Sequence, residues 1–171
     1  VLKTTEEEST AYLKADFGFR VSAPPESRLL DPQLGGGALL DIGIYPLYLS
    51  LLLLGEPKDL KAEAILDANG VDRYCSVLGS FKNNAKSIME SSFLSNTPTE
   101  AFIYGSNGFI HMKSKFHQCE EIVVHDYDSK TDTVYKLPIK GNGYPHEIEE
   151  IHHCLKSGKT ESNLLPHSMS L

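Results

Sequence analysis

The sequence predicts an α+β domain, an open and mostly antiparallel β-sheet with helices packed on one face. Three observations lead to this fold class. Residues 37–54 form a nearly continuous apolar segment, residues 58–137 contain short strand-like stretches separated by turn-like residues, and an amphipathic segment follows them. Because short connections join the successive strands, antiparallel pairing is favoured over parallel pairing, which needs long crossovers.

The N-terminal part of the chain begins with a polar stretch that includes three consecutive glutamates. We therefore expect residues 1–10 to be a disordered or linker lead-in, and residues 11–171 to form the domain. Residues 12–20 alternate aromatic or aliphatic side chains with polar ones, as a strand does. Arg20 ends this strand just before a proline-containing loop. It is a candidate for binding an anionic substrate, although such an arginine is more often a surface or interface residue.

The first predicted helix follows three glycines and reads Gly-Gly-Gly-Ala-Leu-Leu-Asp-Ile-Gly-Ile-Tyr-Pro over residues 35–46. Asp41 and Tyr45 are four residues apart, so on a helix they share one face. Pro46 allows two geometries: the regular helix begins close to Tyr45, with Asp41 on a preceding turn, or the helix is kinked. Both place the pair at the helix N-terminus, where the dipole favours a carboxylate. The pair is either catalytic or structural, with Asp41 as a cap and Tyr45 packed.

The strands that follow are predicted at residues 58–66, 72–82, 85–94, 99–104, 109–112, 120–126 and 133–137. One sheet face is expected to carry the helices. The other face needs a second subunit or domain to cover it if it is apolar. The chain has enough phenylalanines to build such a face, with candidates at Phe17, Phe19, Phe93, Phe102 and Phe109.

The second predicted helix spans residues 146–156, and its apolar stripe of Ile148, Ile151 and Leu155 is expected to pack on the sheet. Histidine and glutamate at helical spacing can also bind zinc. The residues concerned lack an HExxH pattern, so a solvated helix face is favoured over a metal site: His146, Glu149, His152 and His153. The last residues begin a new element and stop abruptly, which suggests a truncated C-terminal end.

Composition narrows the function classes. The net charge of −7 and the lack of a Lys/Arg run argue against nucleic-acid binding. Three widely spaced cysteines favour free thiols in a reducing, cytoplasmic setting over zinc or disulfides. Residues 42–54 are too short to cross a membrane, which takes about 20 residues. Neither glycine cluster, at residues 35–37 or 105–108, follows a strand and opens a helix, so neither predicts a nucleotide loop.

The motif at residues 35–46, together with Ala-Asp-Phe-Gly-Phe-Arg before it and Gly-Tyr-x-x-Glu-Ile-Glu-Glu after the sheet, resembles one family. It is similar to the C-terminal domain of the glucose–fructose oxidoreductase, inositol dehydrogenase and rhizopine-catabolism (Gfo/Idh/MocA) family. Within this family the pattern is nearest to the dimeric dihydrodiol dehydrogenase type. The resemblance implies a glyceraldehyde-3-phosphate dehydrogenase-like C-terminal domain for substrate binding and dimerisation.

The resemblance also implies a mechanism and partners. Tyr45 matches the catalytic acid/base of the family, and Asp41 matches the carboxylate that helps place the substrate and catalytic side chain. NAD or NADP would be bound mainly by an N-terminal Rossmann domain, which also supplies a catalytic lysine and is not found in this sequence. We therefore expect this chain alone to be inactive and to form a homodimer through its open sheet face. A non-catalytic assembly module and a ligand-binding regulator remain alternatives.

Overall fold

The computed structural model describes residues 11–139, 141 and 143–170. The predicted lead-in at residues 1–10 lies outside this description. The chain divides into two compact units, Val1–Lys136 and Leu137–Leu171. The first unit holds the sheet and the Asp41–Tyr45 segment. The second holds the C-terminal helix.

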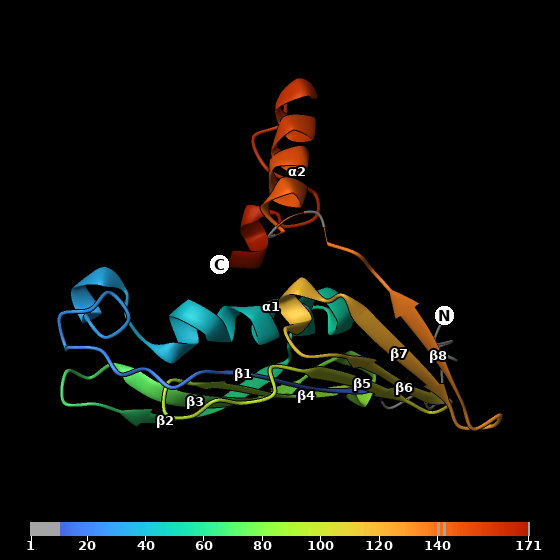
Figure 1. The fold of residues 1–171 in the computed structure, drawn as a ribbon, viewed down its shortest axis with the longest axis horizontal. Helices are drawn as coiled ribbons and strands as arrows, with labels where there is room; N and C mark the ends of the chain where they lie inside the picture. Colours follow the sequence, from blue (N-terminus) through green and yellow to red (C-terminus); the bar gives the residue numbers. More distant parts are fainter. Residues whose placement is uncertain (1–10, 140, 142, 171) are drawn as a thin grey trace. The chain divides into compact units, whose positions relative to one another are not determined.

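The first unit is built on one eight-stranded sheet in the order β2-β3-β4-β1-β5-β6-β7-β8. All of the predicted strands are present, and eleven of their sixteen boundaries shift by a residue or two. The α+β fold class with an open, mostly antiparallel sheet is confirmed (Figure 1). The strands are β1 (Tyr12–Gly18), β2 (Asp59–Leu66), β3 (Asp72–Ser80), β4 (Lys86–Ser92), β5 (Ala101–Gly105), β6 (Gly108–Met112), β7 (Glu121–Asp126) and β8 (Thr131–Lys136).

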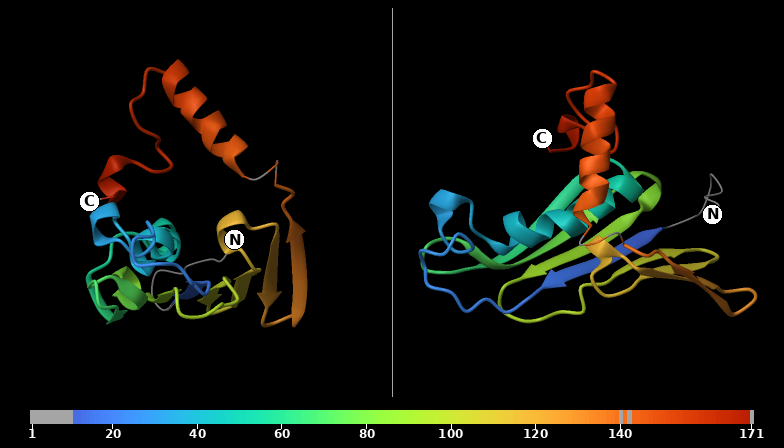
Figure 2. Two further views of the ribbon diagram at one scale, coloured as in Figure 1. Left: turned by 60° about the vertical axis from the view of Figure 1, so that its left-hand side comes forward. Right: turned by 45° about the horizontal axis from the view of Figure 1, so that its top comes forward.

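The first strand lies in the middle of the sheet, between β4 and β5, as the right-hand view of Figure 2 shows. It pairs in parallel with β4, where Tyr12 is opposite Lys86, and antiparallel with β5, where Tyr12 is opposite Tyr104. The sheet is therefore not a simple meander. The central position of β1 explains why Leu13 and Ala15 are almost completely buried.

One face of the sheet is covered by the apolar helical segment. A π-helical turn, η2 (Leu39–Gly43), leads directly into α1 (Ile44–Leu54), which lies along the sheet in Figure 1. This is the first of the two geometries allowed by Pro46. The proline lies in the first turn of α1, where a missing N–H removes no helical hydrogen bond. The core beneath the helix comprises Leu13, Ala15, Leu49, Cys75, Val77, Met89, Ala101, Ile103 and Phe116.

The opposite face carries the residues that alternate with this core. Tyr12 stacks on Tyr104 with ring centroids 4.4 Å apart, and Phe102 lies 6.2 Å from Phe109. The prediction was right for Phe102 and Phe109 as members of an aromatic open face. It was wrong for the other three phenylalanines, which belong to a second core cluster on the helix side: Phe93, fully buried, with Phe17 and Phe19 packed against it.

The second unit contains α2 (Tyr144–Lys156) and a short helical turn, η5 (His167–Ser170). The predicted helix is confirmed, and it begins two residues earlier than expected. Its apolar stripe is more than half exposed, at 51% for Ile148, 55% for Ile151 and 68% for Leu155. The packing of this stripe on the sheet stays a prediction.

The helical stretch Pro32–Leu54 has 23 residues and a mean hydropathy of 1.8, so it is long and apolar enough to cross a membrane by length and composition. The core helix of a soluble protein passes the same test, and α1 contributes Leu49 to the core. Within the described residues, no group of three or more His, Cys, Asp or Glu side chains is arranged to hold a metal ion.

Candidate active site

The start of the helical segment is held by a carboxylate from the neighbouring strand. Asp72, the first residue of β3, accepts a hydrogen bond through Oδ2 from the backbone N–H of Leu39 at 2.7 Å. Gly37, two residues earlier, has a φ of 126°, and a Cβ there would collide with Asp72 Oδ1. A glycine is therefore required both by the backbone conformation and by the close approach of the carboxylate.

Asp41 lies in the π-helical turn, a type of distortion that is frequent at functional sites. Its Oδ1 accepts a hydrogen bond at 2.8 Å from Nη1 of Arg28, whose side chain is 71% exposed, whereas that of Asp41 is 19% exposed. Arg28 comes from the loop before the glycine run. Sequence reasoning missed this partner because the loop gives no periodic signal that would place Arg28 opposite Asp41.

Tyr45 lies in the first turn of α1 and is 40% exposed. Its ring is 5.5 Å from that of Phe17 on β1 and 5.2 Å from that of His117, measured between centroids. Phe17 and His117 stack on each other at 4.7 Å with an interplanar angle of 15°. We call Phe17, Tyr45 and His117 the aromatic triad. It joins three elements that are distant in the sequence.

His117 is the second functional candidate that sequence reasoning missed. It lies in the short turn η4 (Phe116–Gln118), between β6 and β7. Its Nδ1 is buried and has no hydrogen-bond partner. Burial lowers the pKa of His117, and the nearby Lys115 ammonium lowers it further. Its position after β6 was the only sequence signal, and a single histidine at a strand end is too common to be decisive.

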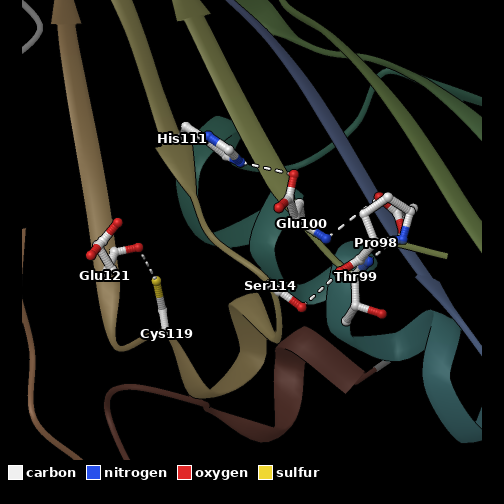
Figure 3. Close-up of polar contacts among 8 residues, drawn as sticks. Pro98, Thr99, Glu100, His111, Ser114, Cys119 and Glu121 are labelled. Atoms are coloured by element: carbon white, nitrogen blue, oxygen red, sulfur yellow. Dashed lines mark hydrogen bonds and ion pairs between the residues drawn. The ribbon is translucent and has the colours of Figure 1, made fainter. Parts of the chain in front are cut away.

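The loop that carries His117 is fixed on both sides, as Figure 3 shows. On one side, Ser114 Oγ donates to the carbonyl oxygen of Pro98 at 3.0 Å, and the Phe116 N–H donates to that of Thr99 at 3.1 Å. On the other side, Cys119 Sγ lies 3.2 Å from the carbonyl oxygen of Glu121. The backbone that carries His117 is thus fixed independently of the triad contacts.

Arg20, the predicted substrate-binding residue, is exposed just beyond the end of β1. Its backbone N–H donates to Asn96 Oδ1 at 2.9 Å. No contact found among the described residues joins its side chain to Asp41 or Tyr45, so its substrate role stays a prediction. The structure brings Asp41 and Tyr45 to the same end of the helical segment, as their spacing predicts. It adds Arg28 beside the first and His117 beside the second.

The fold is that of known oxidoreductases. An aldose-aldose oxidoreductase from Caulobacter crescentus, solved with glycerol, superposes with a TM-score of 0.73 at 22% identity, over 86% of this chain and 46% of that one. The 3-ketoreductase KijD10 from Actinomadura kijaniata, in complex with NADP and TDP-benzene, gives a TM-score of 0.71 at 21% identity, over 91% of this chain and 48% of that one.

The sequence identifies the family. Residues 10–111 match the GFO/IDH/MocA C-terminal domain, and the chain belongs to this family. It is 29% identical over 160 residues to trans-1,2-dihydrobenzene-1,2-diol dehydrogenase of Xenopus tropicalis, covering 90% of this chain and 48% of that protein. It is 30% identical over 131 residues to the NADP(+)-dependent scyllo-inositol 2-dehydrogenase IolU of Bacillus subtilis, covering 77% and 39%. The chain thus spans about half the length of such relatives.

Proposed function

We propose that this chain is the substrate-binding domain of an NAD(P)-dependent oxidoreductase that acts on a hydroxyl group of a sugar, polyol or dihydrodiol. Family membership and the names of the relatives support the reaction class. The observation that carries the assignment to this site is the position of Tyr45. Tyr45 is 40% exposed at the start of α1, one helical turn from Asp41.

The chemistry assigns one task to each side chain. Oxidation of a secondary alcohol removes a hydride from carbon and a proton from oxygen, and the nicotinamide supplies the hydride acceptor when it is bound. Tyr45 Oη is the group that exchanges the hydroxyl proton, as general acid–base catalysis requires. Asp41, oriented by its hydrogen bond from Arg28, places a substrate hydroxyl beside Tyr45.

The described residues do not fit the phosphates of a nicotinamide cofactor. Helix N-termini preceded by glycines can bind phosphate through free N–H groups. Here the Asp72 carboxylate already accepts from the Leu39 N–H and fills the space beside Gly37, so a second anion would be repelled. Gly108 is the first residue of β6, directly after the tight β5–β6 connection, and does not begin a helix. We therefore propose that the phosphates are held by a part of the protein outside this chain.

The decisive experiment is Tyr45→Phe in the full-length protein, with substrate oxidation followed through NAD(P)H absorbance. We expect kcat to fall by about 10²–10⁴-fold, the usual contribution of a general acid–base group. The thermal midpoint should stay unchanged because only one hydroxyl group, on a partly exposed residue, is lost. Tyr135→Phe is the matched control, since Tyr135 is an exposed tyrosine on β8. Retained activity in Tyr45→Phe would favour the non-catalytic assembly or ligand-binding module.

A second expectation concerns this chain in isolation. Because the phosphate sites and the catalytic lysine implied by the family resemblance lie outside it, purified residues 1–171 should not turn over any sugar or diol with NAD or NADP. Measurable turnover by residues 1–171, abolished by Tyr45→Phe, would contradict the proposal that the phosphate sites and the catalytic lysine lie outside this chain.

We also propose that the partner of the open sheet face is a second copy of this chain. The face presents aromatic side chains on β1, β5 and β6 and charges of both signs on β1 and β4. In a two-fold dimer, the aromatic patch of one copy lies against the same patch of the other copy. Two aromatic surfaces pack well on each other, so this face can bind its own copy.

A further inference from the structure

We propose that His117 is a substrate-binding residue that donates a hydrogen bond from Nε2–H to the oxygen next to the one processed by Tyr45, so that the site selects vicinal oxygens over a lone alcohol. The inference rests on the proposed function and adds a feature of the substrate, a second oxygen next to the one that reacts. Its basis is the aromatic triad.

The protonation state of His117 follows from its surroundings. Nδ1 is buried without a partner, and an unpaired buried N–H is costly because its lost hydration is not replaced. The imidazole therefore keeps Nδ1 as a bare lone pair and carries its single proton on Nε2. A second proton would place an unpaired N–H at Nδ1 and a cation beside Lys115, which agrees with the lowered pKa of this ring. His117 is thus a neutral hydrogen-bond donor.

The position of this donor is set by two independent groups of contacts. The loop hydrogen bonds from Ser114 and Phe116 to the Pro98–Thr99 segment fix the backbone. That segment is itself held by Asp16 on β1, whose Oδ2 accepts from the Thr99 N–H at 2.7 Å. Stacking on Phe17 then fixes the plane of the ring. Such a preorganised donor loses little entropy when a ligand binds.

The rings of Tyr45 and His117 lie in direct contact, with centroids 5.2 Å apart and an interplanar angle of 52°. Because Nδ1 is the buried edge of the imidazole, we infer that Nε2 and the phenol hydroxyl can reach two neighbouring oxygens of one small ligand. A single alcohol uses only the phenol. A vicinal diol, or the corresponding hydroxyketone, also satisfies the imidazole, and its carbon skeleton lies against the aromatic rings. A site that hydrogen-bonds a substrate hydroxyl discriminates strongly against the analogue that lacks it.

The test compares trans-cyclohexane-1,2-diol with cyclohexanol in the full-length protein. His117→Phe keeps an aromatic ring for stacking but has no donor, whereas His117→Gln retains an amide N–H near the position of Nε2. For His117→Phe we expect kcat/KM on the diol to fall about tenfold or more, mainly through KM, with no change on cyclohexanol. His117→Gln should recover most of the loss. His152→Phe, an exposed histidine on α2, is the control.

Nitrogen NMR of histidine-labelled protein provides a readout that does not depend on turnover. The His117 ring should show the Nε2–H tautomer, and its Nε2 signal should shift with the diol but not with the same concentration of cyclohexanol. An Nδ1–H tautomer, or equal losses on both substrates in His117→Phe, would overturn the inference. If the wild-type protein oxidises neither compound, the NMR comparison still decides the role of His117, and Tyr45→Phe assayed on sugars and dihydrodiols decides the proposed function separately.

Discussion

At the scale of single residues, the site depends on polar atoms whose partners are fixed by the fold. Asp41 is oriented by Arg28, whereas the buried Nδ1 of His117 has no partner and can tolerate that only without a proton. The hydrogen bond from Arg28 thus sets the orientation of Asp41, and the lack of a partner at Nδ1 sets the protonation state of His117. The protonation state of His117 has a measurable consequence for the free energy of unfolding.

We predict that His117 makes this chain less stable in mild acid. In the unfolded chain its imidazole binds a proton near the ordinary pKa of about 6.5. In the folded chain burial and Lys115 lower the pKa, so the unfolded state binds more protons as the pH falls below that value. The free energy of unfolding should therefore decline relative to the His117→Phe variant between about pH 6.5 and the lowered folded-state pKa. Above about pH 6.5 the contribution is constant.

Urea titrations of both proteins from pH 8 to pH 5 measure this difference. The two stability curves should run parallel above neutrality and diverge in acid, with the wild type losing more. Curves that remain parallel throughout would show that His117 takes up its proton equally well in the folded state.

At the scale of elements, the junction of η2 with β3 controls where the helical segment begins. Gly35 and Gly37 both have positive φ, but only at Gly37 would a Cβ meet another group, the Asp72 carboxylate. We predict that Gly35→Ala costs about 1 kcal/mol, the ordinary penalty of a left-handed alanine. Gly37→Ala should cost about 1–2 kcal/mol more, because it also displaces the cap at Leu39. Urea unfolding measures both, and equal losses would mean that Asp72 does not determine the helix start.

The same scale separates what could be predicted from the sequence from what could not. Strands and helices depend on local patterns, so the eight strands, α1 and α2 were all predictable. The insertion of β1 between β4 and β5 was not predictable, because no local sequence pattern indicates that Tyr12 pairs with the distant Lys86. The site divides in the same way. Asp41 and Tyr45 are linked by helical spacing, whereas His117 reaches Tyr45 only through the tertiary fold.

At the scale of the whole molecule, the two faces of the sheet carry different side chains. The face covered by α1 carries the candidate site. The open face, in contrast, combines aromatic and charged residues, among them Tyr12 at 42% exposure. Eight strands about 4.8 Å apart, each five to nine residues long at about 3.3 Å per residue, give a surface of roughly 600–1,000 Å². A standard interface buries about 800 Å² per partner, so the open face is large enough for a stable dimer.

We predict that this chain forms a homodimer through the open face and that Phe109→Arg disrupts it. Phe109 lies among Phe102, Tyr104, His125 and Tyr127, with ring centroids 4.9–6.2 Å away. An arginine there would place an unpaired charge within the aromatic patch that the dimer buries, and the dissociation constant should increase at least 100-fold, as for loss of a central interface residue. Leu53→Arg, on the exposed side of α1, is the control and should stay dimeric. Sedimentation velocity at micromolar concentration distinguishes the states. A monomeric wild type would contradict the dimer, and a dimeric Phe109→Arg would show that another surface forms it.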